Sequence, residues 1–177
     1  MKTTLAVFFD AMRARFEEFA LQLHPDKTRL IEFGRFAAPD RERRGLGKPE
    51  TFNFLGFTFI CGRSRRGGFL LKRKSRRDRM RAKLKEIKEE LRQRMHWPIP
   101  EQGSWLAQVI RGFFNYHAVP TNFTALGKFR HQVIRHWLQT LRRRSQTDDT
   151  PWMRMEKLEP KILHPWPAVR FAAKYPR

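Results

Sequence analysis

Residues 51–91 read TFNFLGFTFICGRSRRGGFLLKRKSRRDRMRAKLKEIKEEL, and they decide the fold because an alternating aromatic segment passes directly into a strongly basic one. Thr51–Cys61 places phenylalanines at alternating positions on either side of Gly56, which predicts a strand with a bulge or a close backbone approach at the glycine. Ser64–Gly68 supplies turn residues, and Phe69–Lys72 predicts a return strand. The stretch therefore predicts a β-hairpin with three arginines at its tip: Arg63, Arg65 and Arg66.

The basic segment that follows predicts an amphipathic helix over Arg76–His96. Its apolar residues recur every three or four positions, as expected for one buried helical face: Met80, Leu84, Ile87, Leu91 and Met95. Between Arg63 and Arg94 there are 15 Lys or Arg and 4 Asp or Glu, a local net charge of +11. Such a surface repels itself unless a polyanion neutralises it.

The composition of the whole chain points the same way. Its 177 residues include 38 Lys or Arg against 17 Asp or Glu, a net charge of +21, while 40% of residues are hydrophobic, enough for a folded core. Nucleic acid is the expected partner, and an anionic membrane surface is the alternative. No apolar run approaches the roughly 20 residues that span a bilayer, so no integral membrane protein is expected.

Catalytic and metal-binding signatures are weak. Cys61 is the only cysteine, which excludes an internal disulfide and the usual zinc spacings and favours a cytoplasmic location. The adjacent Asp148 and Asp149 could bind metal but are better explained by turn formation beside Pro151. His131 and His136 are five positions apart, too far round a helix for one metal, and are read as phosphate contacts or half-buried residues. No catalytic or metal-binding residue is assigned.

Hydrophobic spacing places the remaining elements. Leu5–Leu23 predicts a helix that stops at Pro25, residues 28–36 a short strand, and residues 37–50 a loop. Ser104 is expected to cap a second bundle helix that ends at Val119-Pro120, with Phe113 and Phe114 in the core. A third helix, capped by Thr121 or Asn122, buries seven apolar residues: Leu126, Phe129, Val133, Ile134, Trp137, Leu138 and Leu141. A short helix is expected over residues 152–158.

These elements predict an α+β fold, with a small antiparallel sheet in residues 1–73 followed by a three-helix bundle in residues 74–177. Three segments resemble the C-terminal part of bacterial group II intron-encoded reverse transcriptases, also called maturases: LHPDKTRLIEFGRFA (23–37), FNFLGFTF (52–59) and RGFFNYHAVPTN (111–122). The resemblance runs from about residue 11 to the end of the chain. It implies that the sheet is a remnant of a polymerase palm and that the bundle is the thumb, an RNA-binding maturase domain.

The resemblance also assigns residues to roles. It places four residues in the primer grip: Phe54, Leu55, Gly56 and Phe57. Phe54 is expected to be packed, so that Phe54→Ala would cost about 3 to 5 kcal/mol. Together with the charge pattern, the resemblance implies RNA contacts from Arg63, Arg65, Arg66, Lys72, Arg73, Lys74, Arg76, Arg77, Arg79, Arg81, Lys83, Arg111, Asn115, Tyr116, Arg142, Arg143 and Arg144.

The expected partner is structured group II intron RNA, whose splicing the chain would assist. The family's Tyr-any-Asp-Asp active site lies before the region of resemblance, and residues 1–22 do not supply it, so no DNA synthesis is expected from this chain alone. No cofactor is expected on this chain, and Mg²⁺ only with the missing catalytic part. Two alternatives remain: the C-terminal subunit of a split polymerase with an N-terminal reverse transcriptase fragment as its partner, or a non-functional remnant that aggregates through exposed phenylalanines, namely Phe8, Phe9 and Phe52.

Overall fold

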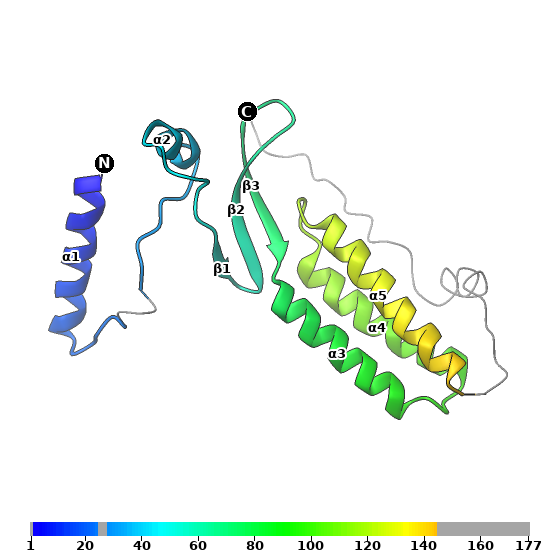
Figure 1. The fold of residues 1–177 in the computed structure, drawn as a ribbon. Coiled ribbons are helices and arrows are strands. Elements are labelled where there is room, and N and C mark those ends of the chain that lie inside the picture. The colour runs from blue at the N-terminus through cyan, green and yellow to red at the C-terminus, as the bar shows by residue number, and fades with distance from the viewer. Residues whose placement is uncertain (1, 25–27, 145–177) are drawn as a thin grey trace. The chain divides into compact units, whose positions relative to one another are not determined.

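The computed structural model describes residues 2–24 and 28–144, and the chain divides into two compact units, Met1–Phe33 and Gly34–Arg177. The first unit contains helix α1, Lys2–Glu18 (Figure 1). This helix ends earlier than predicted because Ala20 takes a left-handed conformation, with φ of 54°. The N–H of Leu21 then bonds to the carbonyl of Phe16, which closes the last turn.

The segment between α1 and the sheet differs from both predictions made for it. Residues 28–33 form no strand, and their apolar residues Leu30, Ile31 and Phe33 lack the strict alternation of a half-buried strand. Part of the predicted loop is a short helix, α2, at Ala37–Arg43. Pro39 lies in its first turn, where a missing N–H costs no hydrogen bond, and Gly45, with φ of 65°, follows its end.

The sheet has three antiparallel strands in the order β1, β2, β3: Phe52–Phe54, Phe57–Arg63 and Phe69–Ser75. The predicted single strand with a bulge is wrong, since Leu55 and Gly56 form a two-residue turn between β1 and β2. Both residues have positive φ, 44° and 74°, as the tight hairpin turn that suits twisted strands requires. The second hairpin, with its tip at Ser64–Gly68, is confirmed.

Pairing of the strands divides their side chains between two faces. Phe52 pairs with Phe59 and Phe54 with Phe57, so these four share one side, which we call the aromatic face. On β3 the same face carries Phe69, Leu71, Arg73 and Ser75. Phe57 is buried, whereas Phe54 is 58% exposed. The expectation that Phe54 is packed is therefore wrong, because it lies on the edge strand next to the turn.

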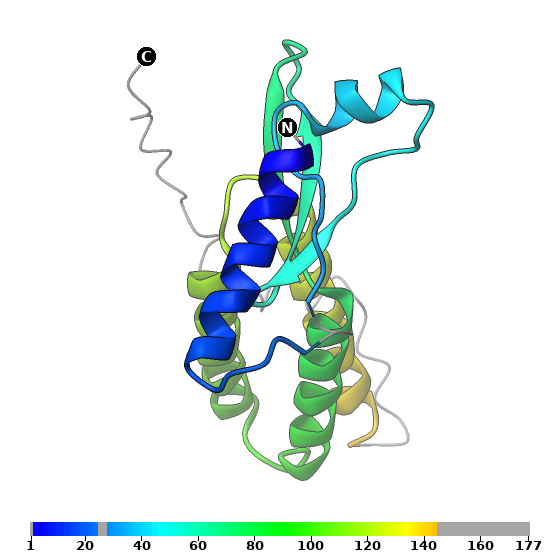
Figure 2. The same ribbon diagram turned by 90° about the vertical axis from the view of Figure 1, so that its left-hand side faces the viewer.

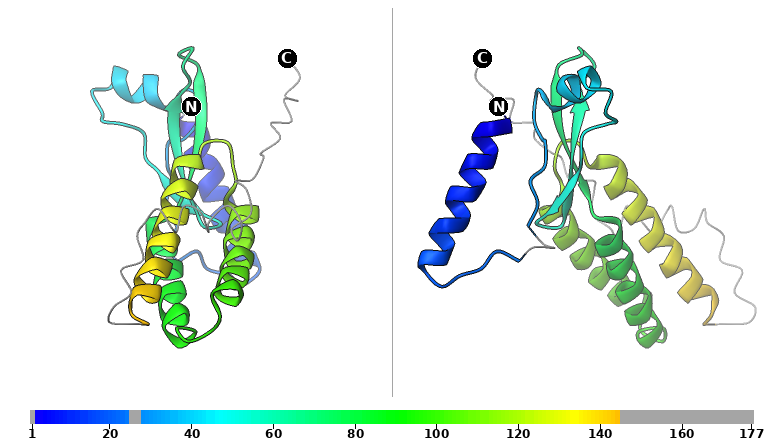
Figure 3. Two further views of the ribbon diagram at one scale, coloured as in Figure 1. Left: turned by 90° about the vertical axis from the view of Figure 1, so that its right-hand side faces the viewer. Right: turned by 60° about the vertical axis from the view of Figure 1, so that its left-hand side comes forward.

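Three helices form the bundle, namely α3 at Arg77–Gln93, α4 at Ile99–His117 and α5 at Phe123–Arg142. They run side by side, with the sheet at one end and β3 leading directly into α3 (Figures 2 and 3). All seven apolar residues predicted for the third helix are buried, which confirms its packing face. The α3 stripe is also confirmed through Leu91, while Met95 lies beyond the end of the helix. The predicted α+β class, a small antiparallel sheet followed by three packed helices, is confirmed.

The start of α4 differs from prediction. The helix begins at Ile99, with Pro98 as its N-cap, rather than after Ser104. Proline is tolerated in the first turn, so Pro100 does not end the helix as the sequence pattern suggested. The helix predicted over residues 152–158 and the pair Asp148-Asp149 lie outside the described residues.

A fully buried glutamine joins the three helices. The Gln102 side chain donates from Nε2 to the carbonyl oxygens of Arg94 at 2.9 Å, Met95 at 3.2 Å and Trp97 at 3.1 Å. Its Oε1 accepts a bond from the Trp137 indole at 2.9 Å. Gln102 therefore satisfies the carbonyls left open at the end of α3 and ties that end to α5.

Replacing Gln102 with leucine should lower the free energy of unfolding by about 2 to 4 kcal/mol, because the buried Trp137 indole N–H would lose its acceptor and the three carbonyls would each lose a donor. Urea denaturation of the full chain measures this loss. Gln108→Leu, at an exposed position of the same helix, is the control and should change stability by less than about 0.5 kcal/mol. Equal stability of the two variants would contradict the role given to Gln102.

Candidate nucleic-acid interface

The turn between β1 and β2 rests on the end of α4. The Tyr116 hydroxyl donates to the Leu55 carbonyl oxygen at 2.8 Å, and its ring lies 5.7 Å from that of Phe57 at an interplanar angle of 20°. The Phe57 ring also meets His117 edge-on at 5.0 Å. Two segments singled out in the sequence, FNFLGFTF and RGFFNYHAVPTN, therefore contact each other.

The end of β3 is fastened to the link between α4 and α5. Asn122 accepts the N–H of Ser75 at 2.9 Å and donates to the Ser75 hydroxyl at 2.7 Å and to the His117 carbonyl at 2.9 Å. Beside it, the Thr121 hydroxyl accepts the N–H of Arg73 at 2.8 Å and donates to its carbonyl at 3.0 Å. We call this set of contacts, together with Tyr116 on Leu55, the junction.

A neutral histidine completes the junction. Ser75 Oγ lies 3.0 Å from His117 Nδ1, and the tautomer of the ring sets which of the two atoms donates this hydrogen bond. Burial lowers the pKa of His117 below its usual 6.5, since the charged ring would lose its water.

Positive charge gathers beside the junction. Of the 21 residues from Arg63 to Lys83, 11 are Lys or Arg and only Asp78 is acidic. We call this segment the basic strip. Asp78 is fully exposed and bonded to Arg76, and that hydrogen bond lowers the pKa of its carboxyl. The rest of α3 has no net charge, because its three cations alternate with three carboxylates, and Lys85 lies 3.8 Å from Glu89.

The residues predicted to contact RNA fall into separate groups. Those at the hairpin tip are exposed, and the exposed Arg77, Arg79 and Arg81 follow on the first turns of α3. Lys72 and Lys74 lie on the sheet face opposite Arg73, since neighbouring residues of a strand point to opposite sides. Arg111 and Asn115 are exposed on α4, and Tyr116, although bonded in the junction, is 55% exposed.

The three arginines that end the third helix are remote from the others. The 20 residues of α5 span about 30 Å, so Arg142, Arg143 and Arg144 lie roughly that far from Asn122 at its start. They do not form one site with the basic strip.

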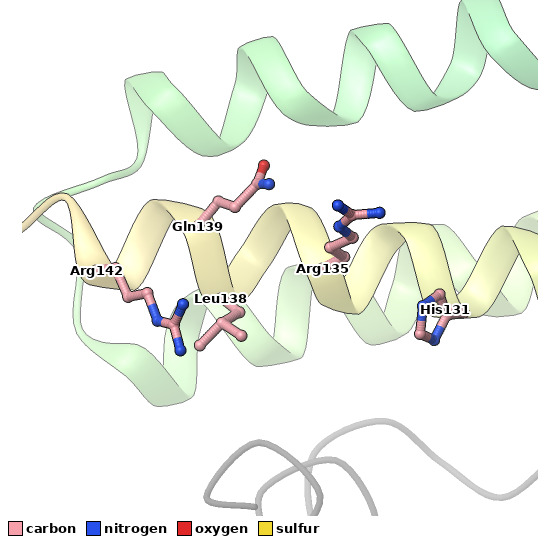
Figure 4. A pocket seen from close by; sticks show the side chains of 5 residues that line it. All are labelled: His131, Arg135, Leu138, Gln139 and Arg142. Carbon is pink, nitrogen blue, oxygen red and sulfur yellow. The ribbon is translucent and has the colours of Figure 1, made fainter. Parts of the chain in front are cut away.

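Helix α5 carries more positive charge than the three arginines at its end. From Gln102 to Thr147 the sequence has no acidic residue, and this absence is the signal that could have identified the helix as a basic surface. A shallow pocket on α5 is lined by His131, Arg135, Leu138, Gln139 and Arg142, whose side chains follow one side of the helix (Figure 4). Half-buried His136 lies on the same helix, and burial lowers its pKa, as do Lys88 and Arg135 to a smaller extent.

Other functional classes find little support in the part of the chain that the structure describes. Within residues 2–24 and 28–144, no three His, Cys, Asp or Glu side chains gather closely enough to hold a metal ion. None of the helices described there has the length and apolar content needed to cross a bilayer. Comparisons with protein-family models, with curated proteins and with solved structures find no match. The function therefore rests on the surface chemistry of the chain itself.

Replacing Asn122 with alanine should lower the free energy of unfolding by about 2 to 4 kcal/mol, because the Ser75 N–H, the Ser75 hydroxyl and the His117 carbonyl each lose a buried hydrogen bond. The same change at Asn115, which is exposed on α4, is the matched control and should be nearly neutral. Chemical denaturation of both variants measures the difference. Similar stabilities for the two would show that the junction does not hold the sheet on the bundle.

Stability should also fall below neutral pH. Because the pKa of His117 is lowered in the folded state, the unfolded chain binds the proton more readily once the pH drops below about 6.5. The loss should begin there and continue until the folded-state pKa is passed. Denaturation of the wild type and of His117→Gln between neutral and acidic pH measures it; the variant should lose less stability, and parallel curves would contradict the assignment.

Proposed function

We propose that this chain binds folded RNA through the basic strip, as the thumb-like part of a protein that resembles group II intron reverse transcriptases and assists intron splicing. One observation carries the proposal: the excess positive charge runs from the tip of the second hairpin through the junction to the first turns of α3 instead of being spread along that helix. A charged surface kept only for solubility would show the mixed, paired pattern of the second half of that helix.

The chemistry of the strip suits phosphate groups. Arginine presents several N–H donors in a plane, which matches phosphate oxygens. Arg77 and Arg79 are exposed at the N-terminus of α3, where the helix dipole also favours negative charge. The strip therefore offers strong contacts to the backbone of an RNA and little that distinguishes one base from another.

Preference for a folded RNA would come from shape. The junction holds the sheet and α3 in one arrangement through hydrogen bonds from Asn122 and Thr121, so the cations at the hairpin tip and on α3 are held at fixed separations. A rigid set of cations binds best to phosphates that are themselves rigidly placed, as in a structured intron. The segments FNFLGFTF and RGFFNYHAVPTN both resemble the reverse transcriptase family. Their contact through Tyr116 and Leu55 supports this proposal, because it brings both segments to the same surface.

Neutralising the exposed arginines of α3 should weaken RNA binding and reduce its dependence on salt. In the variant Arg77→Gln, Arg79→Gln, Arg81→Gln, we expect affinity for folded group II intron RNA to fall at least about tenfold, with the salt slope reduced by about 2 to 3. Filter binding across a salt series measures both quantities.

The matched control carries the same charge change on the same helix, as Lys85→Gln, Lys88→Gln, Arg92→Gln. It should bind much more like the wild type, because these cations alternate with carboxylates. Equal weakening by the two variants would show that net charge alone determines binding. Competition with unstructured RNA of the same length tests the second part of the proposal, and equal affinity for the two RNAs would contradict a maturase role.

A further inference from the structure

The aromatic face of the sheet leaves phenylalanine rings in contact with solvent. Phe54 is 58% exposed, and Phe69 and Leu71 on β3 are each 40% exposed. The face is covered near Phe57 by Tyr116 and His117 of α4 and at Cys61 by the backbone of Gly34, so the open part lies at Phe54 and along β3. A ligand that covered these rings would remove apolar surface from water, which is favourable.

The rings are arranged as a platform for stacking. Phe52 and Phe59 form a parallel pair, with centroids 4.9 Å apart and an interplanar angle of 2°. Phe54 lies 6.4 Å from Phe59 and is tilted by 55°, so its ring is not stacked on that pair. A flat aromatic ligand could therefore lie against Phe54 without displacing any contact within the sheet.

Two arginines share the aromatic face with these rings. In the strand register Arg73 lies opposite Phe59, and Arg63 lies opposite Phe69 at the tip of the hairpin, so both arginines share the aromatic face. Glu42 approaches the Arg63 guanidinium at 3.9 Å, a contact between two well exposed side chains. The complementary ligand has flat rings joined by negative charges. Unpaired RNA has this chemistry, whereas an apolar protein surface would leave the arginines without partners.

We propose that the aromatic face binds unpaired bases of RNA, with a base stacked on Phe54, a nearby phosphate paired with Arg73, and a phosphate further along the strand paired with Arg63, which lies about 20 Å from Phe54 along the sheet. The inference rests on the proposed RNA-binding function and adds a second mode of contact. The basic strip on α3 holds the backbone of folded RNA, and the sheet holds a single strand beside it.

The test compares two RNA probes on the full chain. One is an oligoadenylate of about 12 nucleotides with a central 2-aminopurine, whose fluorescence falls on stacking, and the other is a duplex of the same length. Phe54→Leu should weaken binding of the single strand about tenfold and abolish the added quenching, while duplex binding stays unchanged. Phe54→Trp, which keeps an aromatic ring, should retain both.

The control is Phe36→Leu, which changes a phenylalanine of similar exposure, 62%, beside α2 rather than on the strands. Phe36→Leu should leave the binding of both probes unaffected, and thermal melting should show that each variant is folded.

Two results with Phe54→Leu would overturn the inference: equal weakening of binding to the two probes, or no weakening of binding to either. In the second case a protein would become the better candidate for the partner of this face. A wild type that binds the duplex but not the single strand overturns the inference alone, whereas one that binds neither probe near physiological salt also overturns the proposed function.

Discussion

The arrangement of the sheet on the bundle depends on one buried amide. Asn122 bonds to the end of β3 and to the end of α4 at once, and it does so from the first residue before α5. Without it, the remaining hydrogen bonds of the junction would be those of Thr121 with Arg73, Tyr116 with Leu55 and His117 with Ser75. The position of every cation in the basic strip relative to α4 and α5 therefore follows from a few hydrogen bonds.

Much of the fold could be predicted from the sequence because the core positions have a clear period. The seven apolar residues of α5 and the stripe of α3 recur every three or four positions, and each faces the core. The turn at Leu55 and Gly56 was missed for a definite reason. Phenylalanines at 52 and 54 and at 57 and 59 alternate on either side of a step of three residues, and this step fits a bulge within one strand as well as a reversal of the chain.

The candidate site was predictable in composition but not in arrangement. Counting charges identifies the arginines and lysines, yet it cannot place Lys72 and Arg73 on opposite faces of a sheet, since that depends on the register. The junction could not be predicted from the sequence either, because the contacts of Asn122 join residues 47 positions apart. The sequence signal for the junction was the family resemblance of the two segments that contain FLGF and NYH, and these segments contact each other in the structure.

The uneven charge of α3 has a consequence for how the chain would approach a partner. Along α3 the excess cations lie at the sheet end and the balanced charges at the other end, so this helix has a charge asymmetry of its own, whereas the far end of α5 carries a separate group of cations, Arg142, Arg143 and Arg144. Both groups attract a polyanion before contact is made, because the field of such charges extends beyond the surface. Encounters that begin at the hairpin and the start of α3 would already be oriented for the basic strip, so fewer of these collisions would be lost to wrong orientations.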